Sequence, residues 1–517
     1  MLRRRIGQTS HQAQQTAGLA AALGRDFTLD LLTEASDLDE DTVARAVDEL
    51  WRGQIVRELG AGYDFSHDLL RDAAYEMVSP PQRWLLHRRL AQALELSAAG
   101  GDDLSALLAE QYERGGRPDR AREHYGRAAE VAAARFAAGE AVRLHRRALA
   151  IVTAQPPGPQ RDERELGCLL ALAAPLNAQQ GYSSPDMRTV LERAVHLAES
   201  LGSNQRLVSS LLGLWSSRFV QGDIVDSLRV AARALSLSEV GAVLPGEAHF
   251  AYAGSSATLG RPADAVEHFD MAHDSCRGAE SLVVGTMPEV HALAWSAHAH
   301  WLLGQAEMAA DRAAEAVGRA RAFAHPYSLA VALAYASITY QLLDDTDALD
   351  GSVEELGELS SRYGFAYYAE WGLVLGGWLR GGQQGVGEIR RGVENLRRQL
   401  SLARMPYWLS LLADAQARDG RTEEAVAALD AAHMSASSRG DAWWLPEITR
   451  LRAAHGPAEH RDRLLRTALD LAERQGSRAL AERCRRDLGD LSGPQDLDDR
   501  PGRTVPAVGA GVAGSER

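Results

Sequence analysis

The sequence predicts an all-α protein built from helical hairpins, with one β-hairpin near its N-terminus. Two observations support this prediction. Alanine is abundant while aromatic residues make up only 6% of the chain, and this composition favours helix over sheet. In the second half, turns recur at nearly constant spacing between amphipathic segments. At 517 residues the chain is too long for one compact core, so we expect two or three structural units.

Residues 1–66 are predicted to form a small module of three helices closed by a β-hairpin. Thr9–Leu23 has a weak helical pattern, Thr28 caps a short second helix, and Asp39 caps a firmer third one. Two alternating segments in residues 55–65 flank a Gly-Ala-Gly turn, which indicates the hairpin. The apolar residues of the third helix recur at helical spacing: Val43, Val47, Leu50 and Trp51. This order of elements is that of a winged helix.

A winged helix often binds DNA, and its third helix usually carries the contacts. Here the surface of that helix is acidic. Its charged residues are Asp39, Glu40, Asp41, Arg45, Asp48 and Glu49. Such a surface repels phosphate, so nucleic acid is not expected as a partner of this module.

Residues 67–100 are predicted to be two joint helices between the module and the helical array. The first runs from His67 to Val78. Pro80 and Pro81 then end it and open the second, because proline lacks an amide donor and suits a helix's first turn. Apolar residues recur along the second helix: Trp84, Leu85, Leu90, Ala91 and Leu94.

The rest of the chain divides by composition. Residues 101–152 read as first helical repeats, and the proline-rich residues 153–164 as a linker. Residues 165–488 read as a solenoid of helical hairpins that ends in a polar terminal helix. From residue 489 glycine, proline, aspartate and serine dominate, so 489–517 is predicted to be a disordered tail.

The repeat in this region has three marked positions. Turns are separated by 38, 44, 39, 39, 38 and 36 residues. They fall at Gly222, Gly260, Gly304, Leu343, Gly382, Gly420 and Gly456. Five residues after each of the first six comes a small residue: Ser227, Ala265, Ala309, Ala348, Gly387 and Ala425. The helix before each turn carries an aromatic residue: Trp215, Tyr252, Trp295, Tyr335, Trp371, Trp408 and Trp444.

Each marked position has a physical role in a helical hairpin. Glycine permits the positive φ that ends the first helix, and the small residue lets the second helix lie close against it. The aromatic residue fills the groove toward the neighbouring hairpin. One hairpin cannot bury both of its apolar faces, so neighbours must stack. The pattern is tetratricopeptide-like, although its period near 39 residues exceeds the standard value of about 34.

Composition also excludes several classes of function. The net charge of −14 gives no general attraction to nucleic acid or to an anionic membrane. Three widely spaced cysteines form neither a disulfide framework nor a zinc cluster, and we expect no metal site. No signal peptide and no apolar run of about 18 residues is present, so we expect a cytoplasmic protein without a membrane span.

The chain contains no lysine, and all 56 of its basic residues are arginine. The P-loop motif GxxxxGK(S/T) uses a lysine ammonium against the β- and γ-phosphates of a nucleotide. That motif is therefore impossible in this chain. No arrangement of catalytic residues stands out elsewhere, so we predict that the chain is not an enzyme.

The joint resembles a known protein family more specifically than the rest of the chain does. HDLLRDAAYE, followed about twenty residues on by LHRRLAQALE, resembles the end of the winged-helix domain in signal-transduction ATPases with numerous domains, the STAND ATPases of AAA type. GYSSPDMRTVLERAVHLAE, LLGLWSSRFVQGD and ARDGRTEEAVAALDAAH look like the tetratricopeptide-like region of the bacterial members. Those proteins, among them transcriptional regulators and cyclases, place an effector and an ATPase core before these regions. The resemblance covers about residues 15–475.

The resemblance implies a role for His67 and Asp68. In that family the histidine of this pair reaches the phosphate of bound ADP and helps hold a closed resting state. The chain has no ATPase core, so we expect no cofactor in it, and ATP or ADP only where an upstream or separate core is present. The alternative interpretation is that His67 caps the helix that it begins and packs on Tyr63 and Phe65.

Two further groups of residues were weighed as sites. Tyr367, Tyr368, Trp371 and Trp378 form an aromatic-rich segment, which reads either as core between repeats or as a concave face for a peptide or small effector. His291, His298 and His300 are spaced unlike the i and i+4 ligands of a helical metal site. We therefore expect these histidines to be buried or at the rim.

The sequence favours one function and leaves two alternatives open. The leading hypothesis is a non-catalytic regulatory and protein-binding arm of a bacterial signalling ATPase or transcriptional regulator. A protein or peptide would bind the concave face of the solenoid, and the joint would relay that event to an ATPase core in cis or in trans. The first alternative is a freestanding tetratricopeptide adaptor. The second is a winged-helix DNA-binding transcription factor, against which the acidic helix argues.

Overall fold

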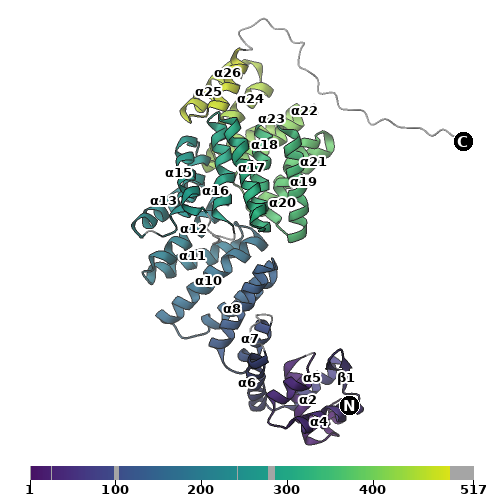
Figure 1. Cartoon of the computed structure of the whole chain (residues 1–517). Helices are drawn as coiled ribbons and strands as arrows, with labels where there is room; N and C mark the ends of the chain where they lie inside the picture. The colour runs from purple at the N-terminus through teal and green to yellow at the C-terminus, as the bar shows by residue number, and fades with distance from the viewer. Residues whose placement is uncertain (1, 25, 98–103, 242, 278–285, 490–517) are drawn as a thin grey trace, which may run out of the picture.

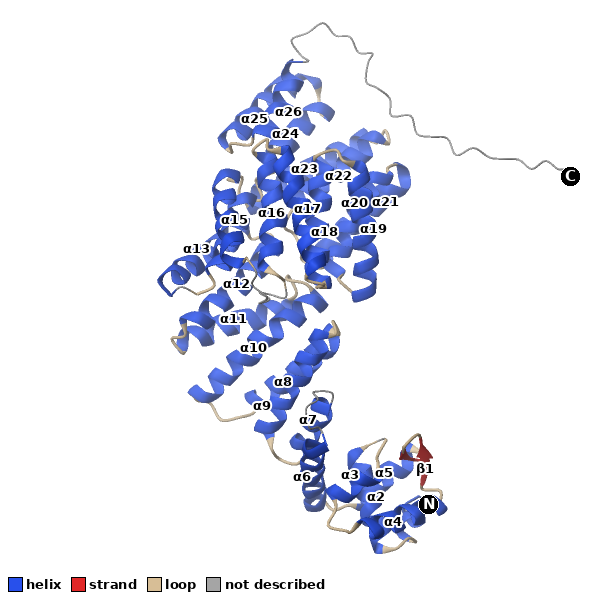
Figure 2. Ribbon diagram, viewed as in Figure 1, coloured by secondary structure: helices blue, strands red, loops and turns tan. Residues whose placement is uncertain are grey.

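The computed structural model describes residues 2–24, 26–97, 104–241, 243–277 and 286–489 (Figure 1). Helices form almost all of it, and the described strands belong to one hairpin in the N-terminal module (Figure 2). The chain runs from that module through a column of helices into a wider coiled array. The predicted tail, apart from Gly489, lies outside the described residues.

The N-terminal module contains the three predicted helices and the hairpin, preceded by a short helix that was not predicted. Its elements are α1 (Leu2–Gly7), α2 (His11–Leu23), α3 (Leu29–Ala35), α4 (Glu40–Arg52), β1 (Val56–Leu59) and β2 (Gly62–Phe65). The caps are confirmed, because Thr28 accepts from the Leu31 amide and Asp39 from the Thr42 amide. The strands are antiparallel, with Val56 opposite Phe65. Assignment of the module to the winged-helix fold stays a prediction.

One residue of the predicted apolar face lies elsewhere. Val43, Val47 and Leu50 are buried, but Trp51 is 51% exposed. Residues 43, 47 and 50 follow one stripe of α4, whereas residue 51 is rotated about 100° from residue 50. The stripe is therefore narrower than predicted.

The joint helices share a core with the elements on both sides. The helices here are α5 (Asp68–Met77), α6 (Pro80–Ser97), α7 (Ser105–Arg114), α8 (Pro118–Ala134) and α9 (Ala138–Thr153). A single cluster of buried apolar residues runs from Ile6 to Ile151. The module, the joint and the first repeats are thus packed as one body, so a displacement of α6 must disturb both of its neighbours.

The helical array follows after a short turn. Its helices are α10 (Pro159–Gln180), α11 (Pro185–Ser200), α12 (Asn204–Val220), α13 (Ile224–Gly241), α14 (Pro245–Thr258), α15 (Pro262–Cys276), α16 (Pro288–Leu302), α17 (Ala306–Ala322), α18 (Pro326–Leu342), α19 (Thr346–Tyr363), α20 (Ala366–Arg380), α21 (Gly382–Arg398), α22 (Met405–Arg418), α23 (Thr422–Arg439), α24 (Leu445–His455), α25 (Arg461–Arg474) and α26 (Arg478–Gly489). The predicted linker was too long: α10 already begins at Pro159 and packs directly on α9, because proline is accepted in a helix's first turn.

The array has an inner and an outer layer. Consecutive helices form antiparallel hairpins, and each even-numbered helix from α10 onward also contacts the next even-numbered one. The even-numbered helices therefore line the inside of the coil. This layer is strongly apolar, and every residue of α16 is buried.

Successive turns of the coil touch through their backbones. The Val220 carbonyl at the end of α12 accepts from the Leu402 and Ala403 amides, at 2.7 and 3.0 Å. The Thr258 carbonyl at the end of α14 accepts from the Ala442 and Trp443 amides, at 2.9 and 3.0 Å. The contacted loops precede α22 and α24, five hairpins further along the chain in both cases. The array is therefore a closely wound superhelix.

The predicted turn glycines explain this close approach. Gly222 has a φ of +81°, and a Cβ atom there would lie 3.1 Å from the Leu402 Cβ. Gly304 has a φ of +80° and a similar approach to Arg478. At Gly420, where φ is +76°, a Cβ atom would meet nothing within 4 Å. At the first two positions glycine thus serves both the hairpin turn and the contact between superhelical turns.

Three marked positions differ from the prediction. In the fourth turn Asp344, one residue after Leu343, takes the positive φ of 59°. Gly456 is extended, at φ −87° and ψ −173°. Gly387 is exposed, and Gly385 instead contacts the Gly377 carbonyl, since α21 begins two residues after α20 ends. In this repeat the small residue that makes the close contact is nearer to the turn in sequence than predicted, because the turn has fewer residues.

Candidate functional site on the inner face

Six of the seven predicted aromatic residues belong to one network of ring contacts in the inner layer, whereas Tyr252 contacts His268 of α15. The ring centroids of Trp295 and Tyr335 are 5.0 Å apart, and those of Tyr335 and Trp371 are 5.1 Å apart. Trp371 continues the stack to Trp408 at 5.0 Å. Such tilted and edge-to-face contacts add stability beyond the area that they bury. The aromatic residues therefore join α16, α18, α20 and α22 into one core.

Three of the four predicted partner-binding residues belong to this core. Tyr367, Tyr368 and Trp371 are 7%, 2% and 0% exposed. The prediction that they form a binding face is wrong for this conformation, because the coil is wound closely enough for its inner side chains to meet. Of the two interpretations left open by the sequence, the core between repeats is the one that the structure supports.

A buried arginine lies at the centre of the stack. Arg404 precedes α22 in a left-handed conformation (φ 61°) and is 5% exposed. Its guanidinium carbon is 5.0 Å from the Trp295 ring centroid and 4.9 Å from that of Tyr335. A buried cation between aromatic faces gains cation–π attraction in place of lost hydration. Trp295 belongs to α16, so Arg404 reaches across the inside of the coil.

Asp441 accompanies this arginine. Its carboxylate is fully buried and accepts from the Arg404 amide at 2.7 Å. Burial raises the pKa of Asp441 to about 6, although the charge of Arg404 acts in the opposite direction. The pair connects the loops before α22 and α24, where the superhelical turns meet. Sequence reasoning missed both residues, since nothing in their local pattern marks them.

The three histidines of α16 are buried, as expected. His298 donates from Nε2 to the Tyr335 carbonyl at 2.9 Å. Burial, with a smaller contribution from Arg404, lowers the pKa of His291 and of His298 to about 3. Both imidazoles are therefore neutral at physiological pH.

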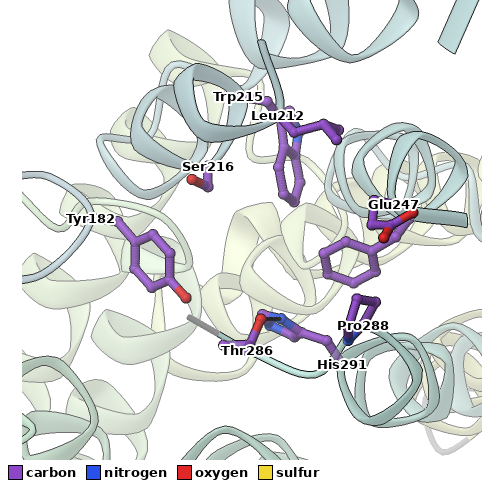
Figure 3. A pocket seen from close by; sticks show the side chains of 9 residues that line it. Tyr182, Leu212, Trp215, Ser216, Glu247, Thr286, Pro288 and His291 are labelled. Atoms are coloured by element: carbon purple, nitrogen blue, oxygen red, sulfur yellow. Dashed lines mark hydrogen bonds between the residues drawn. The ribbon is translucent and has the colours of Figure 1, made fainter. Parts of the chain in front are cut away.

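A small cavity lies beside this core, between the α10–α11 turn and helices α12, α14 and α16 (Figure 3). Its volume is about 30 Å³, and Tyr182, Trp215, Glu247 and His291 are among its lining residues. Burial raises the pKa of Glu247. A space of this size holds a water molecule or two and excludes a peptide.

The remaining predicted residue, Trp378, lines an open groove of about 270 Å³ on the inner face. Its indole donates to Asp414 at 2.7 Å, and the Arg418 guanidinium carbon lies 4.9 Å from its ring centroid. The groove is lined by residues of α18, α20, α22, α24 and α26. An indole edge beside mixed charges suits a ligand with both apolar and hydrogen-bonding groups.

A buried ion-pair network borders this groove. Glu447 accepts from Arg450 at 2.8 Å and from Arg483 at 3.0 Å, and Arg450 also bonds Asp487 at 2.6 Å. Burial alone would raise the pKa of Glu447, but the two guanidinium groups lower it to about 2. The network fixes α26 against α24.

The predicted nucleotide-sensing pair lies at the joint and is exposed. His67 is the N-cap residue of α5, as the alternative interpretation expected, although its side chain forms no capping hydrogen bond. Phe65 and Tyr63 pack on Phe27. Asp68 pairs with Arg71 at 3.4 Å. The role of His67 and Asp68 toward a nucleotide stays a prediction.

The joint is held by a polar chain that the sequence did not reveal. The Tyr75 hydroxyl and His87 Nε2 are 2.8 Å apart, and His87 Nδ1 is 2.7 Å from the Gln111 side-chain oxygen. Gln111 in turn donates to the Ala22 carbonyl at 3.3 Å. Burial lowers the pKa of His87. This chain connects α5, α6, α7 and α2, and its partners are too far apart in sequence to form a motif.

The described residues were also searched for metal ligands, reactive cysteines and membrane-spanning helices. No group of three or more His, Cys, Asp or Glu there is arranged to hold a metal ion. The three cysteines are free thiols, and burial raises the pKa of each. None of the described helices is both long and apolar enough to cross a membrane.

No protein-family profile matches the chain. An uncharacterized protein of Rhizobium meliloti is 26% identical over 502 residues, which cover 93% of this chain and 49% of that protein. The chain thus spans about half the length of the curated relative that it matches.

Two solved structures are distantly similar. One is a signal-transduction ATPase with a tetratricopeptide repeat sensor from Pyrococcus horikoshii, at 12% identity and a TM-score of 0.48, covering 86% of this chain and 65% of that one. The other is a Rap protein complexed with competence and sporulation factor, at 14% identity and a TM-score of 0.37, covering 72% and 98%. At these scores the likeness supports no conclusion about function.

Proposed function

We propose that the chain is a non-catalytic regulatory arm of a bacterial signalling ATPase or transcriptional regulator. The array binds a protein, peptide or small effector, and the joint relays that binding to an ATPase core. The observation that carries the proposal is continuity: the packed superhelix leads through α10 and α9 into the core that also holds α5 and α6. A change at the array therefore has a rigid path to the exposed His67.

The open groove at Trp378 is the proposed effector site. It lies on the inner face, where five helices of different repeats converge, and Trp378 is the residue of the predicted aromatic group that lines it. A ligand there would contact α20 and α26 together, and so would favour one winding of the coil over another. This replaces the broader concave surface that the sequence suggested.

The proposed relay predicts a nucleotide effect. We would add the chain to a separately expressed STAND ATPase core loaded with labelled ADP, and measure ADP release. The chain should slow release, and His67→Ala should remove that effect. His11→Ala is the matched control, because His11 is also exposed at the start of a helix in the same module. Release that is unchanged by the chain, or equally affected by both variants, would contradict the proposal.

A further inference from the structure

A second groove, on the opposite side of α20 from its buried tyrosines, has the features of a docking site. It runs between α19 and α20 and has a volume of about 1180 Å³. Its α19 wall extends from Thr346 to Ser361, which at 1.5 Å per residue is about 24 Å. That length accommodates roughly four turns of a partner helix.

The floor of this groove is made largely of small residues. They include Gly357, Gly364, Ala366, Ala369, Gly372 and Gly376. Leu373 and Leu379 add apolar surface. Small side chains let a second backbone approach closely, and a helix with a matching apolar edge can bury this strip.

One wall of the groove is acidic. Asp347, Asp350, Glu354 and Glu358 are all exposed and follow a single stripe of α19, at spacings of 3, 4 and 4 residues. Within the part of the chain that the structure describes, none of the four forms an ion pair. Glu355, on the adjacent face, pairs with Arg321 instead.

We propose that the α19–α20 groove binds a helical segment of a partner protein that carries arginine or lysine along one edge and small or apolar residues along the other. The acidic stripe selects the basic edge, and the floor of small residues receives the apolar edge. This inference rests on the proposed function only in that the array recruits a partner, and it assigns that partner a surface separate from the Trp378 groove.

The test uses the full chain and a displayed library of 18-residue helical peptides. Peptides are selected on the natural chain and then measured against two variants of α19. Gly357→Trp places a large side chain in the groove, whereas Gly351→Trp adds the same side chain outside it; a Cβ atom at either position would meet nothing within 4 Å. Both substitutions replace a helical glycine, so neither should weaken the helix.

The expected result is enrichment of cationic peptides. Their affinity should fall by at least about tenfold with Gly357→Trp, stay unchanged with Gly351→Trp, and fall steeply with added salt. Glu354→Arg with Glu358→Arg should abolish their binding. Enriched peptides without excess positive charge, or binding that survives Gly357→Trp, would overturn the inference. So would self-association of the chain that Gly357→Trp abolishes. The ADP-release assay is independent of these outcomes, so either idea can fail alone.

Discussion

At the scale of single residues, burial of charge and of titratable rings determines how the inner core behaves. Arg404, Asp441, His291 and His298 are each more than nine-tenths buried in an aromatic environment. Their positions join loops and helices from different superhelical turns. Asp441 and the two histidines are therefore expected to couple the winding of the array to pH.

His298 should make the fold sensitive to acid. Its pKa is lowered from about 6.5 when unfolded to about 3 when folded, so the unfolded chain binds the proton more readily. The stabilisation is complete above pH 6.5 and is lost as the pH falls toward 3, by up to about 1.4 kcal/mol per pH unit. His298→Gln, which keeps a donor for the Tyr335 carbonyl, should flatten the decline in melting temperature between pH 6.5 and 4.5. An unchanged decline would refute this assignment.

Arg404 and Asp441 should behave as a coupled pair. Arg404→Met removes the cation but leaves Asp441 buried, and should destabilise the chain by about 3 kcal/mol in urea unfolding. It should also raise the pKa of Asp441 further above its present value of about 6. Adding Asp441→Asn should recover part of the loss. Simple additivity of the two substitutions would show that they do not interact.

Local residue roles were more predictable than long-range ones. The caps Thr28 and Asp39 were predicted because a cap and its amide lie three residues apart. The contacts of His87 and Arg404 span distant segments, and no local pattern encodes them. Trp378 was singled out with three residues that proved to be core, since periodicity alone does not show where the inner layer opens.

At the scale of the element, two separate constraints act on the glycine of a hairpin turn: its positive φ and its contact with the next superhelical turn. Gly222 needs a positive φ and also lies against Leu402, whereas Gly420 needs the positive φ alone. Gly420→Ala should cost about 1 kcal/mol through backbone strain. Gly222→Ala should cost clearly more, because the loop before α22 must also move. Equal losses of unfolding free energy for the two variants would argue against the close approach of the turns.

The helices themselves were largely predictable, since alanine content, prolines in first turns and amphipathic spacing act locally. The predicted helix boundaries were wrong where packing between helices outweighed the local amino-acid composition. The proline-rich segment before α10 reads as a linker, yet Pro159 starts a helix that packs on α9. Likewise Gly385 rather than Gly387 makes the close contact in α21, because the preceding turn is shorter.

At the scale of the whole molecule, the repeat period indicated stacked hairpins but not how tightly they coil. The pitch of a superhelix depends on a small rotation per hairpin, which accumulates over the array. Here the accumulated rotation brings the ends of α12 and α14 onto the loops before α22 and α24. The inner face is filled as a result, except at the Trp378 groove.

This close winding is the central claim, and amide hydrogen exchange tests it most directly. The amides of Leu402, Ala403, Ala442 and Trp443 lie in loops but donate to carbonyls of the preceding superhelical turn. They should therefore exchange slowly, at rates typical of helices. Gly222→Trp should release the first two and leave the second two protected. Fast exchange at all four amides in the unmodified chain would show that the turns do not touch, and would contradict the account.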